Sequence, residues 1–243
     1  MEHDTEFLER ILPTIDGYLH TEAAQLTLWL LRAQERSECR GGALEIGVWM
    51  GKFLSVIFQG TRRKVVGIDI FQHGNTKEIV QSNFSRSFSD TARLSLITDS
   101  SQRLSSEDLT NFNDGKEYDF ISIDGDHTAD AVCNDLVISE SALSDAGIIA
   151  IDDFLNPMAI GVSEGSYRYF LGTNKGKLVP IAYCANKLFV SRPNFSHTYA
   201  KHVLAFIQSY TELPLSRRFE EFRKLGDHWV NQDLIGGKCL ILG

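Results

Sequence analysis

The sequence predicts an α/β fold in which helices cover both faces of a seven-stranded sheet, made of five parallel strands and a terminal antiparallel hairpin. Two observations lead to this prediction. Five short apolar stretches alternate with helical patterns, which is typical of β-α-β units and a parallel sheet. Two further stretches, residues 177–183 and 187–192, are joined by only three residues, and so short a link requires an antiparallel pair.

The five predicted parallel strands are short and mostly apolar, as expected of strands buried on both faces. They are residues 43–47, 64–70, 92–98, 118–124 and 147–151. The predicted helices show apolar residues at helical spacing, and glycines close the first two of them. They are residues 21–36, 52–59, 128–143, 161–171 and about 199–210.

The chain of 243 residues predicts one domain, residues 1–243, because α/β domains often reach this size. We expect a helical cap over about residues 1–40 and a C-terminal helix and tail over about residues 193–243. The tail has no clear pattern, and a homodimer interface is one role it could serve.

The charge of the chain narrows the classes of partner. Lys and Arg total 24 and Asp and Glu total 32, a net charge of −8, whereas nucleic acids and anionic membranes attract a positive surface. The N-terminus lacks the pattern of a signal peptide, and no apolar stretch approaches the roughly 18 to 20 residues of a membrane span. We therefore predict a cytoplasmic protein that binds neither nucleic acid nor membrane.

Acidic side chains follow each of the five predicted parallel strands. Ligands of such sheets bind beyond the carboxyl ends of the strands, so these residues are expected to meet at one edge. They are Glu45, Asp69, Asp99 with Ser100, Asp124, and Asp152 with Asp153. A full row of such residues predicts a binding site.

The turn after the first strand indicates which ligand fits. Gly47 and Gly51 allow the backbone to approach a ligand closely, but Trp49 stands where nicotinamide-binding turns have their middle glycine. Bulk at that position disfavours a pyrophosphate on the helix N-terminus. Asp69, about 20 residues further on, is placed to accept hydrogen bonds from a ribose diol. A sulfonium nucleoside meets both demands.

The motifs resemble one known family. The stretches ALEIGVWMGKF, VVGIDIF, YDFISIDGDHTADAVCNDL and LSDAGIIAIDDF are similar to the Rossmann-like class I S-adenosylmethionine methyltransferases. Within that class they resemble the macrocin-type sugar O-methyltransferases, and the resemblance covers residues 21–192. Metal-using relatives often carry Glu-Asp or Asp-Asn where this chain has Asp152 and Asp153.

The resemblance implies a role for each site residue. Glu45, Gly47 and Gly51 would form the turn that binds the cofactor S-adenosylmethionine. Asp69 would hold its ribose, Asp99 with Ser100 would lie near its adenine, and Asp124 is also expected among the cofactor-binding residues. Trp49 is expected to wall the cofactor pocket. The residues matching a divalent metal site, usually magnesium, are Asp124, Asp152 and Asp153, and His127 matches the general base.

The chemistry of the three carboxylates and of His127 agrees with a metal site and a general base. Three converging carboxylates repel one another unless a cation or protons intervene, and oxygen ligands suit Mg²⁺. A histidine has an ordinary pKa of about 6.5, near working pH, which suits His127 as the base.

The predicted function is methyl transfer from S-adenosylmethionine to a hydroxyl of a small acceptor, such as a sugar or a glycosylated metabolite. Acceptor specificity is expected in residues 156–169. Three alternatives remain open on the sequence: a metal-independent N- or C-methyltransferase, a nicotinamide-dependent oxidoreductase, and a non-catalytic cofactor-binding subunit.

Overall fold

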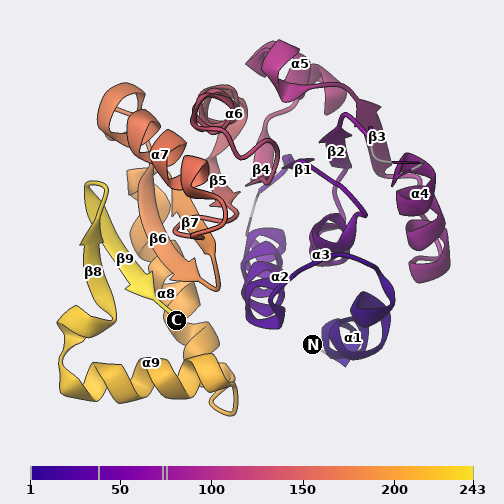
Figure 1. The fold of residues 1–243 in the computed structure, drawn as a ribbon. Helices are drawn as coiled ribbons and strands as arrows, with labels where there is room; N and C mark the ends of the chain where they lie inside the picture. The colour runs from indigo at the N-terminus through magenta and orange to yellow at the C-terminus, as the bar shows by residue number, and fades with distance from the viewer. Residues whose placement is uncertain (1, 38, 73, 75, 243) are drawn as a thin grey trace.

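The computed structural model describes every residue except Met1, Glu38, His73, Asn75 and Gly243. Its centre is one nine-stranded sheet with the order β3-β2-β1-β4-β5-β7-β6-β9-β8 (Figure 1). The first five strands in this order pair in parallel, and β7 pairs antiparallel to both β5 and β6. The strands are β1 (Gly42–Ile46), β2 (Val65–Asp69), β3 (Leu94–Thr98), β4 (Tyr118–Ile123), β5 (Leu143–Ile151), β6 (Val179–Cys184), β7 (Lys187–Ser191), β8 (Asn231–Leu234) and β9 (Gly237–Ile241).

The α/β class and the arrangement of the first seven strands are confirmed, but the predicted count of seven strands is wrong. The C-terminal tail adds the hairpin of β8 and β9, and β9 runs parallel to β6 through the pairs Ala182–Leu240 and Tyr183–Ile241. The sequence of β8, NQDL, has no apolar alternation that would mark a strand. This strand forms because β9 offers it a partner.

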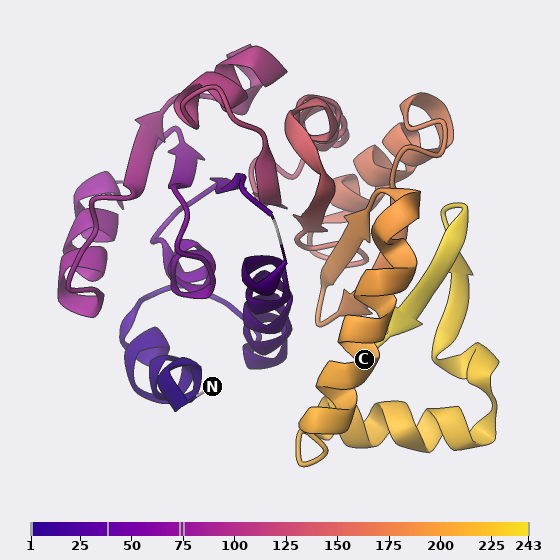
Figure 2. The same cartoon turned by 180° about the vertical axis from the view of Figure 1, so that it is seen from behind.

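The helices lie on both faces of the sheet, as predicted (Figures 1 and 2). Five of them match the predicted helices: α2 (Thr21–Arg36), α3 (Lys52–Gly60), α6 (Ala129–Ala142), α7 (Ile160–Arg168) and α8 (Pro193–Ser209). A sixth, α1 (Glu2–Glu6), lies within the helical cap expected over about residues 1–40. Three more were not predicted: α4 (Thr76–Ser87), α5 (Ser106–Phe112) and α9 (Pro214–Leu225). Short helical turns complete the chain at Phe7–Ile11, Leu12–Thr14, Ser101–Arg103, Tyr169–Thr173 and Asp227–Trp229.

One unpredicted helix, α5, has a start signal in its sequence. The Ser105 hydroxyl accepts from the Asp108 N–H at 3.2 Å, and the Asp108 carboxylate accepts from the Ser105 N–H at 2.8 Å. This reciprocal pair is a capping box, which satisfies N–H groups that a helix end otherwise leaves unpaired.

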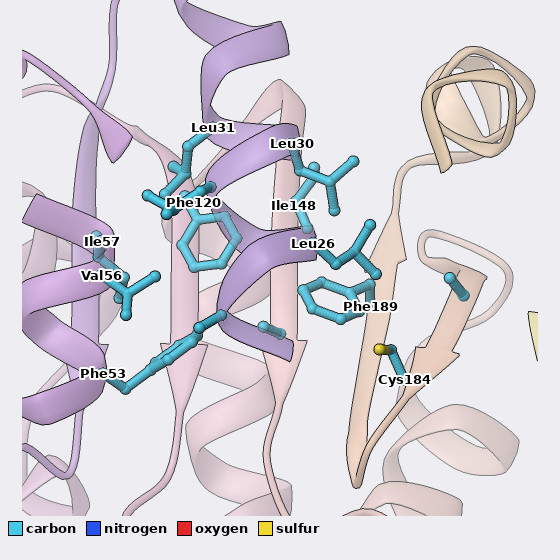
Figure 3. Close-up of a cluster of buried hydrophobic side chains, with 14 of the residues drawn as sticks. Leu26, Leu30, Leu31, Phe53, Val56, Ile57, Phe120, Ile148, Cys184 and Phe189 are labelled. Carbon is cyan, nitrogen blue, oxygen red and sulfur yellow. The ribbon is translucent and has the colours of Figure 1, made fainter. Parts of the chain in front are cut away.

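Two hydrophobic clusters hold the layers together, one on each face of the sheet. The first packs α2, α3, α4 and α8 onto one face, and Figure 3 shows α2 and α3 residues such as Leu30 and Val56 around Phe120 and Ile148 of the central strands. The second packs α5, α6 and α7 onto the other face. Because the central strands are buried on both sides, their ends are held rigidly, which is what a binding site at the sheet edge needs.

The link between β6 and β7 has two residues rather than the three predicted, because Cys184 belongs to β6. Ala185 and Asn186 both have positive φ angles, 47° and 70°, as in the two-residue turns that match the twist of antiparallel strands. The pair Ile151–Leu188 joins β5 to β7. The turn therefore delivers Lys187, the first residue of β7, to the carboxyl end of β5.

Among the described residues, no helix has both the length and the apolar character that crossing a membrane requires.

Candidate active site

The glycine turn after β1 lies directly on the main chain that follows β4. Gly47 has φ = +85°, and a Cβ built on it would come within 1.8 Å of the Asp124 carbonyl oxygen. Gly51, φ = +81°, precedes α3 and faces Val80 of α4, at 3.0 Å from a built Cβ. A left-handed backbone and a close approach both require glycine at position 47. This turn thus brings the ends of β1 and β4 together.

Asp69 organises that turn from the end of β2. Its Oδ2 accepts from the N–H groups of Val48 and Trp49, each at 2.8 Å, and its Oδ1 accepts from the Phe71 N–H at 2.6 Å. Carboxylate oxygens have more than one lone-pair site, so Asp69 retains acceptor capacity toward the cavity that it lines. The bonds also hold Trp49 in a left-handed conformation, φ = 46°.

The larger of two adjoining cavities lies over the ends of β1, β2, β3 and β4. Its volume is about 470 Å³, within the range of small-molecule sites. Its lining contains the predicted cofactor residues Gly47, Trp49, Asp69, Asp99, Ser100 and Asp124. The predicted residues that it does not contain are Glu45 and Gly51.

Asp99, at the rim of this cavity, is paired with Arg103. The Arg103 guanidinium lies 2.6 Å from Asp99 Oδ1, and this bond lowers the pKa of the carboxyl. The same oxygen accepts from the Ser100 N–H at 2.7 Å. Asp99 is therefore an ionised acceptor that holds the Ser100 main chain in place.

The smaller cavity, about 220 Å³, adjoins the larger one at Gly47, Trp49 and Asp124. It also contains Glu45 and His127. Glu45 is 1% exposed, and its Oε2 has no hydrogen-bond partner among the described residues. Burial raises the pKa of Glu45 well above its usual range, and the nearby Asp124 carboxyl adds to the rise.

Asp124, His127 and Asp153 converge beside the smaller cavity. The His127 Nε2 lies 3.7 Å from Asp124 Oδ1 and 3.5 Å from Asp153 Oδ2. One ligand atom from each of the three residues falls within 4.8 Å of the others. Burial raises the pKa of Asp124 to about 7, and Asp152 contributes to the rise. The nearby Asp124 carboxylate raises the pKa of His127, against the opposing effect of burial.

Asp152 lies beside this group but is engaged differently from its neighbours. Its Oδ2 is 2.7 Å from the Nζ of Lys187, a residue only 1% exposed. Burial acts to raise the pKa of Asp152, but the Lys187 ammonium outweighs it and the pKa is lowered. Of the three predicted metal ligands, the structure brings Asp124 and Asp153 together with His127. Asp152 has a protein cation as its partner.

Lys187 is the site residue that the sequence analysis missed. The sequence places it only at the start of the predicted strand 187–192, with no role in the site. Its signal is a single lysine at the start of an apolar strand, KLFV, which carries information only when the pairing of that strand with β5 is known.

The most voluminous cavity described, about 950 Å³, lies elsewhere, between α2 and α8 near the amino ends of β1, β4 and β5. Ligands of open α/β sheets bind at the carboxyl ends of the strands, so we place the candidate active site in the two smaller cavities.

A family model described as a methyltransferase domain matches residues 44–154, which run from β1 to the end of β5 and include Asp124, Asp152 and Asp153. No curated protein matches the chain.

Several solved structures share the fold at low sequence identity. The calicheamicin-biosynthesis enzyme CalS11, a TDP-rhamnose 3'-O-methyltransferase, is 18% identical with a TM-score of 0.53, over 78% of this chain and 93% of CalS11. An O-methyltransferase from Bacillus cereus in complex with SAH (S-adenosylhomocysteine) is 16% identical with a TM-score of 0.56, over 78% and 88%. The mycinamycin-pathway methyltransferase MycE, in complex with Mg and SAH, is 20% identical with a TM-score of 0.52, over 78% and 54%.

The family match covers the strands whose ends form the candidate site, and the structural likeness extends over the flanking elements. Residues 44–154 therefore match a methyltransferase-domain model, and the chain shares the Rossmann-like α/β fold of these methyltransferases.

Proposed function

We propose that this chain transfers the methyl group of S-adenosylmethionine to a hydroxyl of a small acceptor. The observation that carries the proposal is the junction of the two cavities at Gly47, Trp49 and Asp124. A nucleoside in the larger cavity would extend its reactive end past this junction toward His127 in the smaller one. The SAH-bound fold relatives support this choice of cofactor.

The lining of the larger cavity suits a nucleoside without phosphates. Asp69 and Asp99 offer acceptors, whereas Arg103 is already paired with Asp99. The unpartnered carboxyl of Glu45 suits the cationic end of the cofactor, because a buried acceptor without a donor is unfavourable until a ligand supplies one.

The donor set also fits a divalent cation. Asp124 and Asp153 present carboxylate oxygens within 4.8 Å of each other, and Mg²⁺ is commonly held by one or two carboxylates with water. Asp152, the third predicted ligand, has one oxygen engaged by Lys187. A metal bound there would lower the pKa of an acceptor hydroxyl. MycE, which was solved with Mg, supports this assignment.

We assign His127 as the general base. Its side chain is 44% exposed beside the cavity, and Nε2 would accept the proton of the acceptor hydroxyl. The acceptor oxygen then bonds to the methyl carbon as the carbon–sulfur bond breaks, giving a methyl ether and S-adenosylhomocysteine. Alignment of the three atoms is the main demand on the protein.

Exposed apolar side chains flank the site and suit an acceptor with an apolar part. Tyr18 lines the smaller cavity and is 85% exposed. Met158 and Ile160, 90% and 69% exposed, lie between Asp153 and the start of α7. The main chain of α7 touches the His127 loop, because a Cβ built on Gly161 would lie 2.2 Å from the His127 carbonyl oxygen. We therefore propose a hydroxylated acceptor such as a sugar or glycosylated metabolite. A single domain, a cytoplasmic location and a homodimer stay predictions.

Calorimetric titration with S-adenosylhomocysteine tests the cofactor assignment. We expect micromolar binding that Asp69→Ala abolishes and that Asp90→Ala leaves unchanged, because Asp90 lies in the turn before β3. Binding of NAD⁺ in place of S-adenosylhomocysteine, or of neither, would overturn the proposal.

Titration with Mn²⁺ tests the metal separately. Asp153→Asn should weaken Mn²⁺ binding while S-adenosylhomocysteine binding persists. Activity that survives EDTA unchanged would support a metal-independent methyltransferase instead.

A further inference from the structure

We propose that Lys187 is a resident cation of the active site, which engages Asp152 and keeps the carboxyl groups of the site together without a divalent metal. On this view Lys187 is a positioning residue, and Asp124 and Asp153 are left to bind the metal. The inference rests on the proposed function for the identity of the site, but the side-chain geometry stands independently of it.

The side chain of Lys187 is buried between an acidic and an aromatic residue, which hold its ammonium group in place. The side chain is 1% exposed, with Nζ 2.7 Å from Asp152 Oδ2 and 3.9 Å from the centroid of the Phe53 ring. A lysine over an aromatic face gains a favourable cation–π interaction, which is stronger when water is excluded. The ammonium thus has an acidic and an aromatic partner, one from the end of β5 and one from α3.

The main chain holds this lysine in one place. The two-residue turn at Ala185 and Asn186 starts β7, and the Phe154 N–H donates to the Asn186 carbonyl at 2.9 Å. The β5–β7 pairing ends at Ile151–Leu188, and Asp152 and Lys187 are the next residues on the two chains. The ion pair therefore joins the adjacent ends of β5 and β7.

The carboxyl groups around Lys187 explain why a cation is needed. Burial raises the pKa of both Glu45 and Asp124, the Asp152 carboxyl adds to the rise, and Lys187 opposes it. Like charges in a low-dielectric site repel strongly unless a counter-charge or protons intervene. Lys187 supplies that counter-charge from within the chain.

A purely structural ion pair is a weaker explanation. Burying two charges carries a desolvation penalty, and well-packed apolar residues of similar volume often give equal or greater stability. A lysine–aspartate pair at this position serves a function when it sets the charge and the orientation of neighbouring site residues. Here the neighbour is Asp124, whose carboxyl group interacts electrostatically with both Lys187 and Asp152.

The arrangement has a consequence for the metal. A cation at Asp152 repels a second cation at the same carboxylate. The group of described side chains close enough to share an ion is Asp124, His127 and Asp153, as expected if Asp152 is held by Lys187.

The test compares four variants of the full chain: Lys187→Met, Lys187→Arg, Asp152→Asn and the double variant Lys187→Met with Asp152→Asn. Melting temperature is measured in EDTA and in MnCl₂, and Mn²⁺ affinity is measured by calorimetry. We expect the wild type and Lys187→Arg to melt at nearly the same temperature in both conditions. Lys187→Met should melt lower in EDTA and regain stability in MnCl₂, with Mn²⁺ affinity raised by about tenfold or more, because a repelling charge is gone.

The double variant keeps the test decisive if Lys187→Met folds poorly. Removing both partners leaves no unpaired charge at this position, so it should recover stability in EDTA without gaining Mn²⁺ affinity. A Lys187→Met variant that loses stability equally with and without MnCl₂, and binds Mn²⁺ as the wild type does, would show a merely structural pair. Binding of S-adenosylhomocysteine to the wild type is measured in parallel. If the wild type does not bind it, the proposed function is overturned, and the result on Lys187 is judged separately.

Discussion

Gly47 and Asp124, on the turns that follow β1 and β4, meet through their main chains. A Cβ built on Gly47 would lie 1.8 Å from the Asp124 carbonyl oxygen, far inside any real contact. Two neighbouring strand ends are thus joined at the junction of the two cavities. The cofactor turn and the acidic site are one rigid unit, so changes in one should be felt in the other.

Gly47→Ala should lower the affinity for S-adenosylhomocysteine by at least about tenfold and reduce stability by more than the roughly 1 kcal/mol that a left-handed backbone costs an alanine. Gly115→Ala is the matched control, because Gly115 also has positive φ, +76°, but no atom lies within 4 Å of a built Cβ. Titration calorimetry and thermal melting of both variants make the comparison. Equal effects in the two variants would contradict the close contact.

Asp69→Asn should weaken S-adenosylhomocysteine binding by about tenfold to a hundredfold, since each charged hydrogen bond contributes roughly 1.5–3 kcal/mol. The amide keeps the shape of the side chain but replaces one acceptor oxygen toward Val48, Trp49 and Phe71 with a donor. Asp90→Asn, which changes a similar turn carboxylate that accepts from the Ala92 N–H, should bind as the wild type does.

His127→Asn should lower the rate of methyl transfer by about a hundredfold or more and leave S-adenosylhomocysteine binding intact. The Asp124 carboxylate raises the pKa of His127, so the imidazole stays protonated to a higher pH than an ordinary histidine. A base must be neutral, so the wild-type rate should rise with pH through that raised pKa. If the variant keeps the same rise of rate with pH on the acidic side of the profile, the general base is a different residue.

Asp135→Asn should stabilise the protein at neutral pH. Asp135 is fully buried on α6, and burial raises its pKa to about 6, against the hydrogen bond that its Oδ1 accepts from Gln102 Nε2 at 3.0 Å. The folded state therefore holds a proton that the unfolded chain has lost between about pH 4 and 6, so stability falls as pH rises through this window. The gain from the amide should reach about 1–3 kcal/mol above pH 6 and vanish below about pH 4. Denaturant unfolding at the two pH values measures it.

Leu242→Ala should destabilise the protein by about 2–4 kcal/mol. Leu242 is 2% exposed, and its N–H donates to the Tyr183 carbonyl at 2.9 Å, which ties the C-terminal hairpin to β6. Urea unfolding, followed together with S-adenosylhomocysteine affinity, should show lower stability with unchanged binding. If Leu242→Ala unfolds at the same urea concentration as the wild type, the C-terminal hairpin contributes little to stability.

The sequence alone was sufficient for the parallel core because the local signals there agree with the fold. Four of the five apolar stretches between residues 43 and 151 are buried on both faces, and only β3 at the sheet edge is half-exposed, so composition marks the central ones as strands. The side chains that follow a strand must lie at its carboxyl end. Asp69, Asp99, Asp124 and Asp153 could therefore be placed at one sheet edge without knowing a single contact.

The exposed elements could not be predicted in this way. The β8 strand has the polar sequence NQDL and owes its conformation to its pairing with β9. The α4 helix, which begins at Thr76, has few buried residues and a weak apolar face. Elements stabilised by long-range pairing carry little local signal.

The sequence by itself determined the fold class, the sheet edge that carries the site and the kinds of side chain found there, because these follow from periodicity and chain direction. Only the tertiary structure decided how the carboxyl groups are shared: Asp153 faces His127, whereas Asp152 pairs with Lys187. That choice depends on the register between β5 and β7, which the burial of both strands and the geometry of the turn at Asn186 set together. Partners separated along the chain become neighbours only when that register is known.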